Sequence, residues 1–306
     1  MQASTRNASG DNPRLCSIGG SEGRARVDIG AGRPLAIIAG PCVLESLELG
    51  LLVGQRVREA CTRLGLAYVF KASFDKANRS SIHSPRGPGL EQGLAWLDRL
   101  GRELGVPVTT DIHEPEQAEP ASRVIDLLQI PAFLCRQTDL LLAAGQAAAK
   151  HQRGVNVKKG QFMSPPELGL AASKLSEAGC DNVMFTERGT FFGYGRLVND
   201  FIGLGDMIEG TGIKLGPPGG KAGSPPPVCF DCTHSTQMPG TGTTTGGRPE
   251  RAPLLARAAV AAGVHAVFIE CHPEPARALS DASTMQTLES MPALLESLAR
   301  VRDALD

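Results

Sequence analysis

A run of cationic and small polar side chains between positions 71 and 83 is the most chemically suggestive part of this 306-residue chain. It follows the apolar run 68–70 and holds two lysines, an arginine, an asparagine and three serines. Positive charge beside hydroxyls and backbone amides suits a phosphate group, with Arg79 and the lysines supplying charge and Ser80 a short hydrogen bond. The alternative is an ordinary solvated basic loop. The composition therefore favours a phosphate site without proving one.

A second candidate group comprises a thiol, an imidazole and two carboxylates that are far apart in sequence. Its members are Cys42, His234, Glu270 and Asp281. Such a set suits a divalent transition metal such as Zn²⁺, Fe²⁺ or Mn²⁺. The residues alone leave a second interpretation open, in which Cys42 is a small core residue and Glu270 pairs with a lysine.

The pair Cys229 and Cys232 has the spacing of a CxxC metal or redox motif. It lies at a predicted strand, where residues three apart point to opposite faces. We therefore predict no shared ligand for these two thiols.

Composition excludes several classes of function. The formal net charge of −1 gives no general attraction to nucleic acid or membranes, so any anion site must be local. No apolar run is long enough to span a bilayer. The eight cysteines have no framework pattern and no secretory signal precedes them, which predicts reduced thiols in a cytoplasmic protein.

The elements that must position these side chains alternate regularly from residue 35 onward. Strands are predicted at 35–40, 67–73, 106–111, 124–130, 154–159, 182–186, 227–231 and 266–270. Helices are predicted at 46–64, 90–104, 114–122, 138–150, 165–178, 251–262 and 285–305. This rhythm predicts an α/β fold with a single (β/α)8 TIM barrel. A doubly wound sheet is disfavoured, because no Gly-x-Gly-x-x-Gly turn follows the first strand.

The domain organisation expected is one barrel catalytic domain over residues 34–306, preceded by a flexible extension. Residues 1–33 are assigned to that extension because they are rich in Gly, Ser, Asn and Arg. Two Gly/Pro-rich segments, 210–227 and 239–249, are expected to be mobile loops.

In such a barrel the catalytic groups lie at the carboxyl ends of the strands. The polar or otherwise notable residues predicted there are Cys42, Lys71, Asp111, His113, Gln129, Pro131, Arg136, Lys158, Lys159, Gln161, Glu187, Arg188, His234, Glu270, His272 and Asp281. We therefore expect one polar, strongly cationic pocket.

Motifs at these strand ends resemble one enzyme family. They lie at 40–46 (GPCVLES), 70–89 (FKASFDKANRSSIHSPRGPG), 109–114 (TTDIHE), 129–139 (QIPAFLCRQTD), 156–162 (NVKKGQF), 186–190 (TERGT), 231–235 (DCTHS) and 270–275 (ECHPEP). Over about residues 35–305 the chain resembles the 3-deoxy-D-manno-octulosonate 8-phosphate synthases. The resemblance implies a barrel, usually a homotetramer, that condenses phosphoenolpyruvate with D-arabinose 5-phosphate and releases phosphate. That reaction serves lipopolysaccharide synthesis in Gram-negative bacteria.

The resemblance also implies roles for individual residues. Phosphoenolpyruvate would be bound by Lys71, Lys76, Lys158, Arg188 and His234, in a pocket lined by Gln129, Pro131 and Ala132. The arabinose phosphate group would be held by Asn78, Arg79 and Ser80, and a sugar hydroxyl by Asp111. Arg136 would reach the site of a neighbouring subunit.

The family has a metal-dependent form and a metal-free form. The metal-free form carries Asn in place of the cysteine and lacks a Ser-Asp-Ala-Ser segment, whereas this chain has Cys42 and that segment at 280–283. It therefore resembles the metal-dependent form, which implies Cys42, His234, Glu270 and Asp281 as ligands of a divalent transition metal. Two features depart from the family: the segment 210–227 is longer and richer in Pro and Gly, and the extension has no counterpart.

The implied chemistry needs no lysine Schiff base, because phosphoenolpyruvate is already an activated nucleophile. The catalytic groups expected are Asp111, His234, Lys158 and Cys42, with Asp111, His234 or a water at the metal moving protons. The base among these three is not fixed by the sequence.

Three other functions compete with this interpretation. The nearest is a 3-deoxy-D-arabino-heptulosonate 7-phosphate synthase, which uses erythrose 4-phosphate and typically shows Lys-Pro-Arg-Thr-Ser where this chain has Lys-Ala-Asn-Arg-Ser at 76–80. Asn78 offers a longer sugar a hydrogen bond that proline cannot, which favours the pentose. A Schiff-base aldolase using Lys71 or Lys158 and a non-enzymatic sugar-phosphate-binding regulator are the other two.

Overall fold

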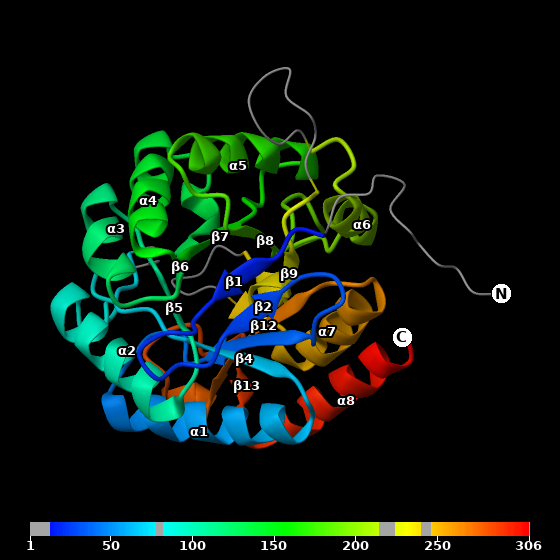
Figure 1. Cartoon of the computed structure of the whole chain (residues 1–306). Helices are drawn as coiled ribbons and strands as arrows, with labels where there is room; N and C mark the ends of the chain where they lie inside the picture. The colour runs from blue at the N-terminus through cyan, green and yellow to red at the C-terminus, as the bar shows by residue number, and fades with distance from the viewer. Residues whose placement is uncertain (1–12, 78–81, 214–223, 240–245, 306) are drawn as a thin grey trace.

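A closed barrel of eight parallel strands forms the centre of the molecule in the computed structural model, which describes residues 13–77, 82–213, 224–239 and 246–305 (Figure 1). The barrel strands are β3 (Ala36–Gly40), β4 (Ala67–Lys71), β5 (Val108–Asp111), β6 (Leu127–Ile130), β7 (Gly154–Lys158), β8 (Val183–Glu187), β9 (Val228–Asp231) and β12 (Ala266–His272). Each pairs in parallel with the next along the chain, and β12 pairs with both β9 and β3. The predicted single (β/α)8 barrel is confirmed.

Helices surround this barrel (Figure 1). They are α1 (Leu47–Arg63), α2 (Leu90–Leu104), α3 (Pro115–Ser122), α4 (Thr138–His151), α5 (Leu168–Glu177), α6 (Phe201–Glu209), α7 (Ala252–Ala261) and α8 (Met291–Asp303). In α2 the buried residues recur three or four positions apart, at Leu94, Leu97, Leu100 and Leu104, so one apolar face packs on the sheet. The predicted helix at 285–305 begins later than expected, because β13 (Gln286–Thr287) extends the edge of β12 first.

The amino end of the barrel is closed by a hairpin that the sequence did not predict. β1 (Cys16–Ile18) and β2 (Val27–Ile29) pair antiparallel, and Figure 1 shows them crossing in front of the barrel strands. Their buried side chains join the barrel's inner core with Phe268. The prediction of a flexible extension over 1–33 is therefore wrong for residues 13–33, because this apolar contact orders them; residues 1–12 lie outside the described residues.

Arg24, in the turn of this hairpin, fastens it to the barrel. Its Nη1 donates to Asp126 Oδ2 at 2.8 Å and to the Val124 carbonyl at 2.6 Å, and its Nη2 donates to Asp98 Oδ1 at 2.8 Å. The side chains of Arg24 and Asp126 are fully buried. A charge removed from water in this way needs such pairing to be tolerated.

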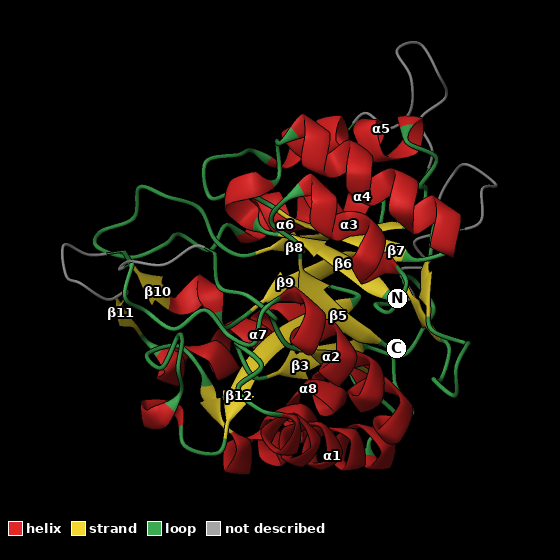
Figure 2. Cartoon of the chain, turned by 90° about the vertical axis from the view of Figure 1, so that its left-hand side faces the viewer, coloured by secondary structure: helices red, strands yellow, loops and turns green. Residues whose placement is uncertain are grey.

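The loops that follow the strands project from the opposite end of the barrel, as does the hairpin of β10 (Gln237–Met238) and β11 (Gly246–Gly247) (Figure 2). The expected mobile loops at 210–227 and 239–249 lie partly outside the described residues. All eight cysteines are buried free thiols. Among the described residues, no helix combines the length and apolar content that a membrane span requires.

Candidate active site

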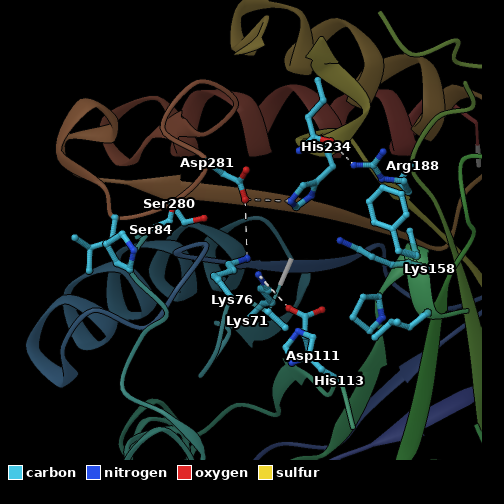
Figure 3. A pocket seen from close by; sticks show the side chains of 18 of the residues that line it. Lys71, Lys76, Ser84, Asp111, His113, Lys158, Arg188, His234, Ser280 and Asp281 are labelled. Atoms are coloured by element: carbon cyan, nitrogen blue, oxygen red, sulfur yellow. Dashed lines mark hydrogen bonds and ion pairs between the residues drawn. The ribbon is translucent and has the colours of Figure 1, made fainter. Parts of the chain in front are cut away.

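A cavity of about 790 Å³ opens at the carboxyl end of the barrel, as the sequence predicted (Figure 3). Its lining includes four of the predicted cations, one predicted metal-ligating histidine and two carboxylates, namely Lys71, Lys76, Lys158, Arg188, His234, Asp111 and Asp281. Pro131 and Ala132 also line it. Side chains that are far apart in sequence therefore converge on one rim.

A chain of hydrogen bonds crosses four neighbouring strands beneath the cavity. The Gln129 amide nitrogen donates to Asp111 Oδ1 at 2.6 Å, and the Asn156 amide nitrogen donates to Gln129 Oε1 at 3.0 Å. The Thr186 hydroxyl donates to Asn156 Oδ1 at 2.8 Å. All four side chains are buried, so each amide is held in one orientation. Gln129, which was predicted to line the pocket, is not among the residues that line the cavity and instead contacts Asp111.

Asp111 is an ionised hydrogen-bond acceptor. Burial alone would raise the pKa of its carboxyl, but the ammonium groups of Lys71, Lys76 and Lys158 outweigh burial and hold that pKa well below its ordinary value. The Ser73 hydroxyl donates to its other oxygen. A carboxylate with so low a pKa is a weak base, so this environment suits accepting a hydrogen bond from a hydroxyl.

Two cations face the cavity from β7 and the end of β8. Lys158 Nζ lies 2.7 Å from Asp231 Oδ2 and 3.9 Å from the centre of the Phe268 ring. Arg188 Nη2 donates to Gln237 Oε1 at 2.6 Å, whereas its Nη1 is buried and has no hydrogen-bond partner among the described residues. A buried donor without an acceptor costs free energy. The free guanidinium nitrogen therefore marks a position for an anionic ligand.

Three of the four predicted metal ligands, Cys42, Glu270 and Asp281, form one cluster, and His234 lies beside its two carboxylates. One ligand atom each from Cys42, Glu270 and Asp281 lie within 4.8 Å of one another. His234 Nε2 lies 3.6 Å from Glu270 Oε2 and 3.7 Å from Asp281 Oδ2. Bonds of about 2.0–2.3 Å to a tetrahedral ion place neighbouring ligand atoms about 3.3–3.8 Å apart, and the two distances from His234 fall in that range. Within the part of the chain that the structure describes, Glu270 Oε2 is buried without a hydrogen-bond partner, and coordination of a cation would compensate that oxygen.

The thiol of Cys42 needs positive charge to ionise here. Burial, together with the carboxylates of Asp281 and Glu270, raises its pKa well above the ordinary value, and its Sγ donates to Asp281 Oδ2 at 2.8 Å. A metal ion would lower that pKa and convert the thiol to a ligand. The donor set therefore fits a divalent cation.

Lys71 and Lys76 balance the charge of these carboxylates. Lys71 Nζ donates to Glu270 Oε1 at 2.6 Å and to the Cys42 carbonyl at 3.0 Å. Lys76 Nζ lies 4.0 Å from Asp281 Oδ2. Although burial opposes its charge, the acidic groups of Cys42, Glu270 and Asp281 raise the pKa of Lys76. The Lys76 amine therefore stays positive.

Asp231, at the end of β9, is a site residue that the sequence analysis missed. Its Oδ2 accepts from His234 Nδ1 at 2.7 Å and lies 2.7 Å from Lys158 Nζ. Its Oδ1 accepts from the backbone N–H groups of Thr233 and His234. With the hydrogen on Nδ1, the Nε2 of His234 is left to face the other candidate ligands. The signal available in the sequence was an aspartate three residues before a histidine at a strand end.

Other predicted residues lie elsewhere. Arg136 is 58% exposed and pairs with Glu167 at 3.6 Å, outside the cavity of its own chain. Lys159 is buried against Glu187, with 3.4 Å between Nζ and Oε2. Asn78, Arg79 and Ser80 lie outside the described residues.

Comparisons with known proteins agree with this geometry. The sequence model of the DAHP synthetase I family matches residues 17–306. The 2-dehydro-3-deoxyphosphooctonate aldolase of a Cyanothece species is 49% identical over 280 residues, covering 91% of this chain and 96% of that protein. The protein of the same name from Nitratidesulfovibrio vulgaris is 50% identical over 264 residues, covering 86% and 90%. The one from a Synechococcus species is 48% identical over 281 residues, covering 92% and 93%.

Proposed function

The chain belongs to the DAHP synthetase I family, and from this premise we propose that it condenses phosphoenolpyruvate, D-arabinose 5-phosphate and water to 3-deoxy-D-manno-octulosonate 8-phosphate and inorganic phosphate. The relatives' shared name specifies an eight-carbon acid. Phosphoenolpyruvate contributes three carbons, so the aldose must contribute five. The same count disfavours erythrose 4-phosphate, which would give a seven-carbon product.

The observation that carries the proposal is the convergence of cations on one cavity that also borders the candidate metal ligands. Lys158 and the unpartnered Nη1 of Arg188 would hold the phosphate of phosphoenolpyruvate. Asn78, Arg79 and Ser80 would hold the phosphate of the aldose, with Asp111 accepting from a sugar hydroxyl. Fixing both anions turns an encounter of two molecules into an oriented reaction.

The bonds change in three steps. C3 of phosphoenolpyruvate attacks the aldehyde carbon, which forms the new carbon–carbon bond, and the aldehyde oxygen takes up a proton. Water adds to C2 and loses a proton. The C2–O bond to phosphate then breaks while the C2 hydroxyl gives up its proton to the departing phosphate, which releases inorganic phosphate and leaves a ketone at C2.

Different residues of the site would have different roles in this reaction. Lys71 and Lys76 lie beside the acidic groups, where their charge would favour anionic forms. His234, held by Asp231, is oriented to accept or return a proton at Nε2 whenever that atom is not a ligand. A divalent transition metal held by Cys42, His234, Glu270 and Asp281 would polarise the aldehyde oxygen or orient the water as a Lewis acid.

The proposal also covers the oligomeric state, the cellular compartment and the pathway of the enzyme. We expect a cytoplasmic homotetramer that serves lipopolysaccharide synthesis, with Arg136 entering the site of a neighbouring subunit. The exposure of Arg136 supports that arrangement. The eight unpaired thiols are consistent with a reducing compartment.

Turnover of purified protein with each aldose phosphate tests the proposal. Phosphate release and product mass should show kcat/KM at least ~100-fold higher with arabinose 5-phosphate than with erythrose 4-phosphate. Borohydride added during turnover should leave the activity intact, because no Schiff base forms. Activity confined to erythrose 4-phosphate, or irreversible loss with borohydride, would overturn the proposal.

A further inference from the structure

The two loops that carry Cys42 and Asp281 must be held together for these side chains to meet. Cys42 follows β3, and Asp281 lies in the loop after β12, 239 positions further along the chain. Asp281 has a φ of +51°, in the left-handed region that costs a non-glycine residue about 1–2 kcal/mol. A loop under such strain holds its conformation only where surrounding contacts fix it.

Glu45 supplies a contact between these loops. Its Oε1 accepts from the backbone N–H of Leu279 at 3.0 Å. Glu45 is three residues after Cys42, and Leu279 is two residues before Asp281. This hydrogen bond therefore joins the two loops beside the ligands themselves.

His272, at the start of the same loop, faces the same oxygen of Glu45. Its Nε2 lies 3.6 Å from Glu45 Oε1. Its Nδ1 accepts from the backbone N–H of Glu274 at 3.0 Å, so the hydrogen of the neutral ring is on Nε2 and points toward Glu45. One carboxylate oxygen thus faces both the beginning of the loop and the segment before Asp281.

We propose that Glu45 is a positioning residue that sets the separation of Cys42 and Asp281 for metal binding. Its side chain is not among the residues that line the cavity. On the far side of Asp281, the N–H and hydroxyl of Thr284 donate to the Asp281 carbonyl at 3.0 and 3.1 Å, so Asp281 is fixed from both directions. The inference rests on the metal site of the proposed function and adds to it the residue that preorganises that site.

Three variants of the 306-residue chain distinguish the effect of the hydrogen bond from the effect of the charge. Glu45→Ala removes the acceptor, whereas Glu45→Gln keeps an oxygen that can accept from Leu279. Glu274→Ala is the matched control, because its carboxylate belongs to the same loop but is exposed and contacts only the exposed Arg277, at 3.3 Å, among the ion pairs of the described residues.

Co²⁺ binding to chelator-stripped protein gives the first measurement, through the thiolate-to-cobalt absorption expected from Cys42, the one thiol among the four candidate ligands. Loss of a residue that orients a metal ligand typically weakens metal affinity about 10–100-fold. We expect that loss for Glu45→Ala, a change of less than ~3-fold for Glu45→Gln, and none for Glu274→Ala. The second measurement is the hydrogen-exchange rate of the Leu279 backbone amide in metal-free protein. This rate should exceed the wild-type rate only in Glu45→Ala.

The outcomes distinguish this inference from the proposed function. Equal Co²⁺ affinity in the wild type and Glu45→Ala would overturn the positioning role and leave the metal centre standing. Glu45→Gln as weak as Glu45→Ala would overturn it as well, because charge and not the hydrogen bond would then matter. Wild-type protein without the sulfur-to-cobalt absorption would overturn the metal centre and the inference together.

Discussion

The amino end and the carboxyl end of the barrel both bury charged side chains, and they differ in how those charges are paired. At the amino end, Asp126 accepts from Arg24, from the backbone N–H of Val108 at 2.9 Å and from Arg153 at 3.3 Å. At the carboxyl end, Glu270 Oε2 and Arg188 Nη1 are buried and make no hydrogen bond to any described residue. One end is closed by its own contacts, and the other leaves polar atoms for a ligand.

The distribution of unpartnered atoms supports this contrast. Among the described residues, the buried side-chain atoms without a hydrogen bond belong to Arg24, His113, Gln161, Arg188, Asn199, Ser235 and Glu270. All except Arg24 lie at or after the carboxyl end of a barrel strand. Such atoms are costly and rare in folded proteins, so their concentration at one end indicates where ligands bind.

Removing the thiol at the carboxyl end should have the largest effect. Cys42→Ala should lower metal-stimulated turnover by about 10³-fold, because a Lewis acid supplies several kcal/mol to the transition state. The measurement is kcat after chelation and readdition of metal, with the melting temperature as control. Cys42→Asn sharpens the test, since it copies the metal-free form and could retain turnover without metal. Full activity of chelated wild-type protein would contradict the assignment.

Removing a charge at the amino end should affect stability and spare the chemistry. Asp126→Asn removes the fully buried carboxylate that pairs with Arg24 and leaves Asp98 as its close carboxylate partner, which should lower the free energy of unfolding by about 3 kcal/mol. Urea denaturation measures this loss. Below the melting transition kcat/KM should be unchanged, and a large fall in kcat/KM would break the contrast between the two ends.

A histidine at the amino end should make stability depend on pH. Burial, with a smaller contribution from Arg302, lowers the pKa of His265 to about 4, and its Nδ1 accepts from the Val228 N–H at 3.0 Å. Between about pH 6.5 and 4 the unfolded chain binds the proton that the native chain excludes, so stability falls as the pH falls.

His265→Asn provides the comparison, because Asn can accept the same hydrogen bond without titrating. Relative to that variant, the wild type should lose on the order of 3 kcal/mol of unfolding free energy between pH 6.5 and 4. Parallel pH profiles of the two proteins would show that His265 does not titrate as described.

The smallest effect expected is at Arg188. Arg188→Lys keeps a positive charge but loses the second nitrogen of the fork, and one charge-assisted hydrogen bond contributes about 1.5–3 kcal/mol. The KM for phosphoenolpyruvate should therefore rise about 10–100-fold, with a smaller change in the KM for the aldose phosphate. An unchanged KM for phosphoenolpyruvate would remove Arg188 from the phosphate site.

The parts of the fold that local sequence dictates were predictable. Helix α2 has the predicted bounds, 90–104, since glycines flank it and its apolar residues recur at helical spacing. The β1–β2 hairpin was not predictable, because its three-residue strands lie in a polar segment and become buried only against a barrel formed by later residues. Helix α6 was also missed, because two glycines in nine residues lower its helix propensity. In the structure the Asp200 side chain caps this helix and stabilises it.

The convergence of the site followed from barrel closure, but individual orientations did not. Lys158 and Lys159 are adjacent, and strand alternation sends Lys158 to the cavity and Lys159 toward Glu187. In the sequence, Asp231 is a carboxylate at a strand end like several others. Its contacts with His234 and Lys158 appear only in the structure. Residue type indicates what a side chain can do, and only the packed structure gives its partners.

A crystal structure of the metal-loaded protein with phosphoenolpyruvate would test the contrast between the ends most directly. We predict an ion bonded at about 2.0–2.3 Å to Cys42 Sγ, His234 Nε2 and the carboxylates of Glu270 and Asp281. The phosphate should accept a hydrogen bond from Arg188 Nη1. An ion bound away from Cys42, or phosphoenolpyruvate bound away from Arg188 and Lys158, would contradict the account.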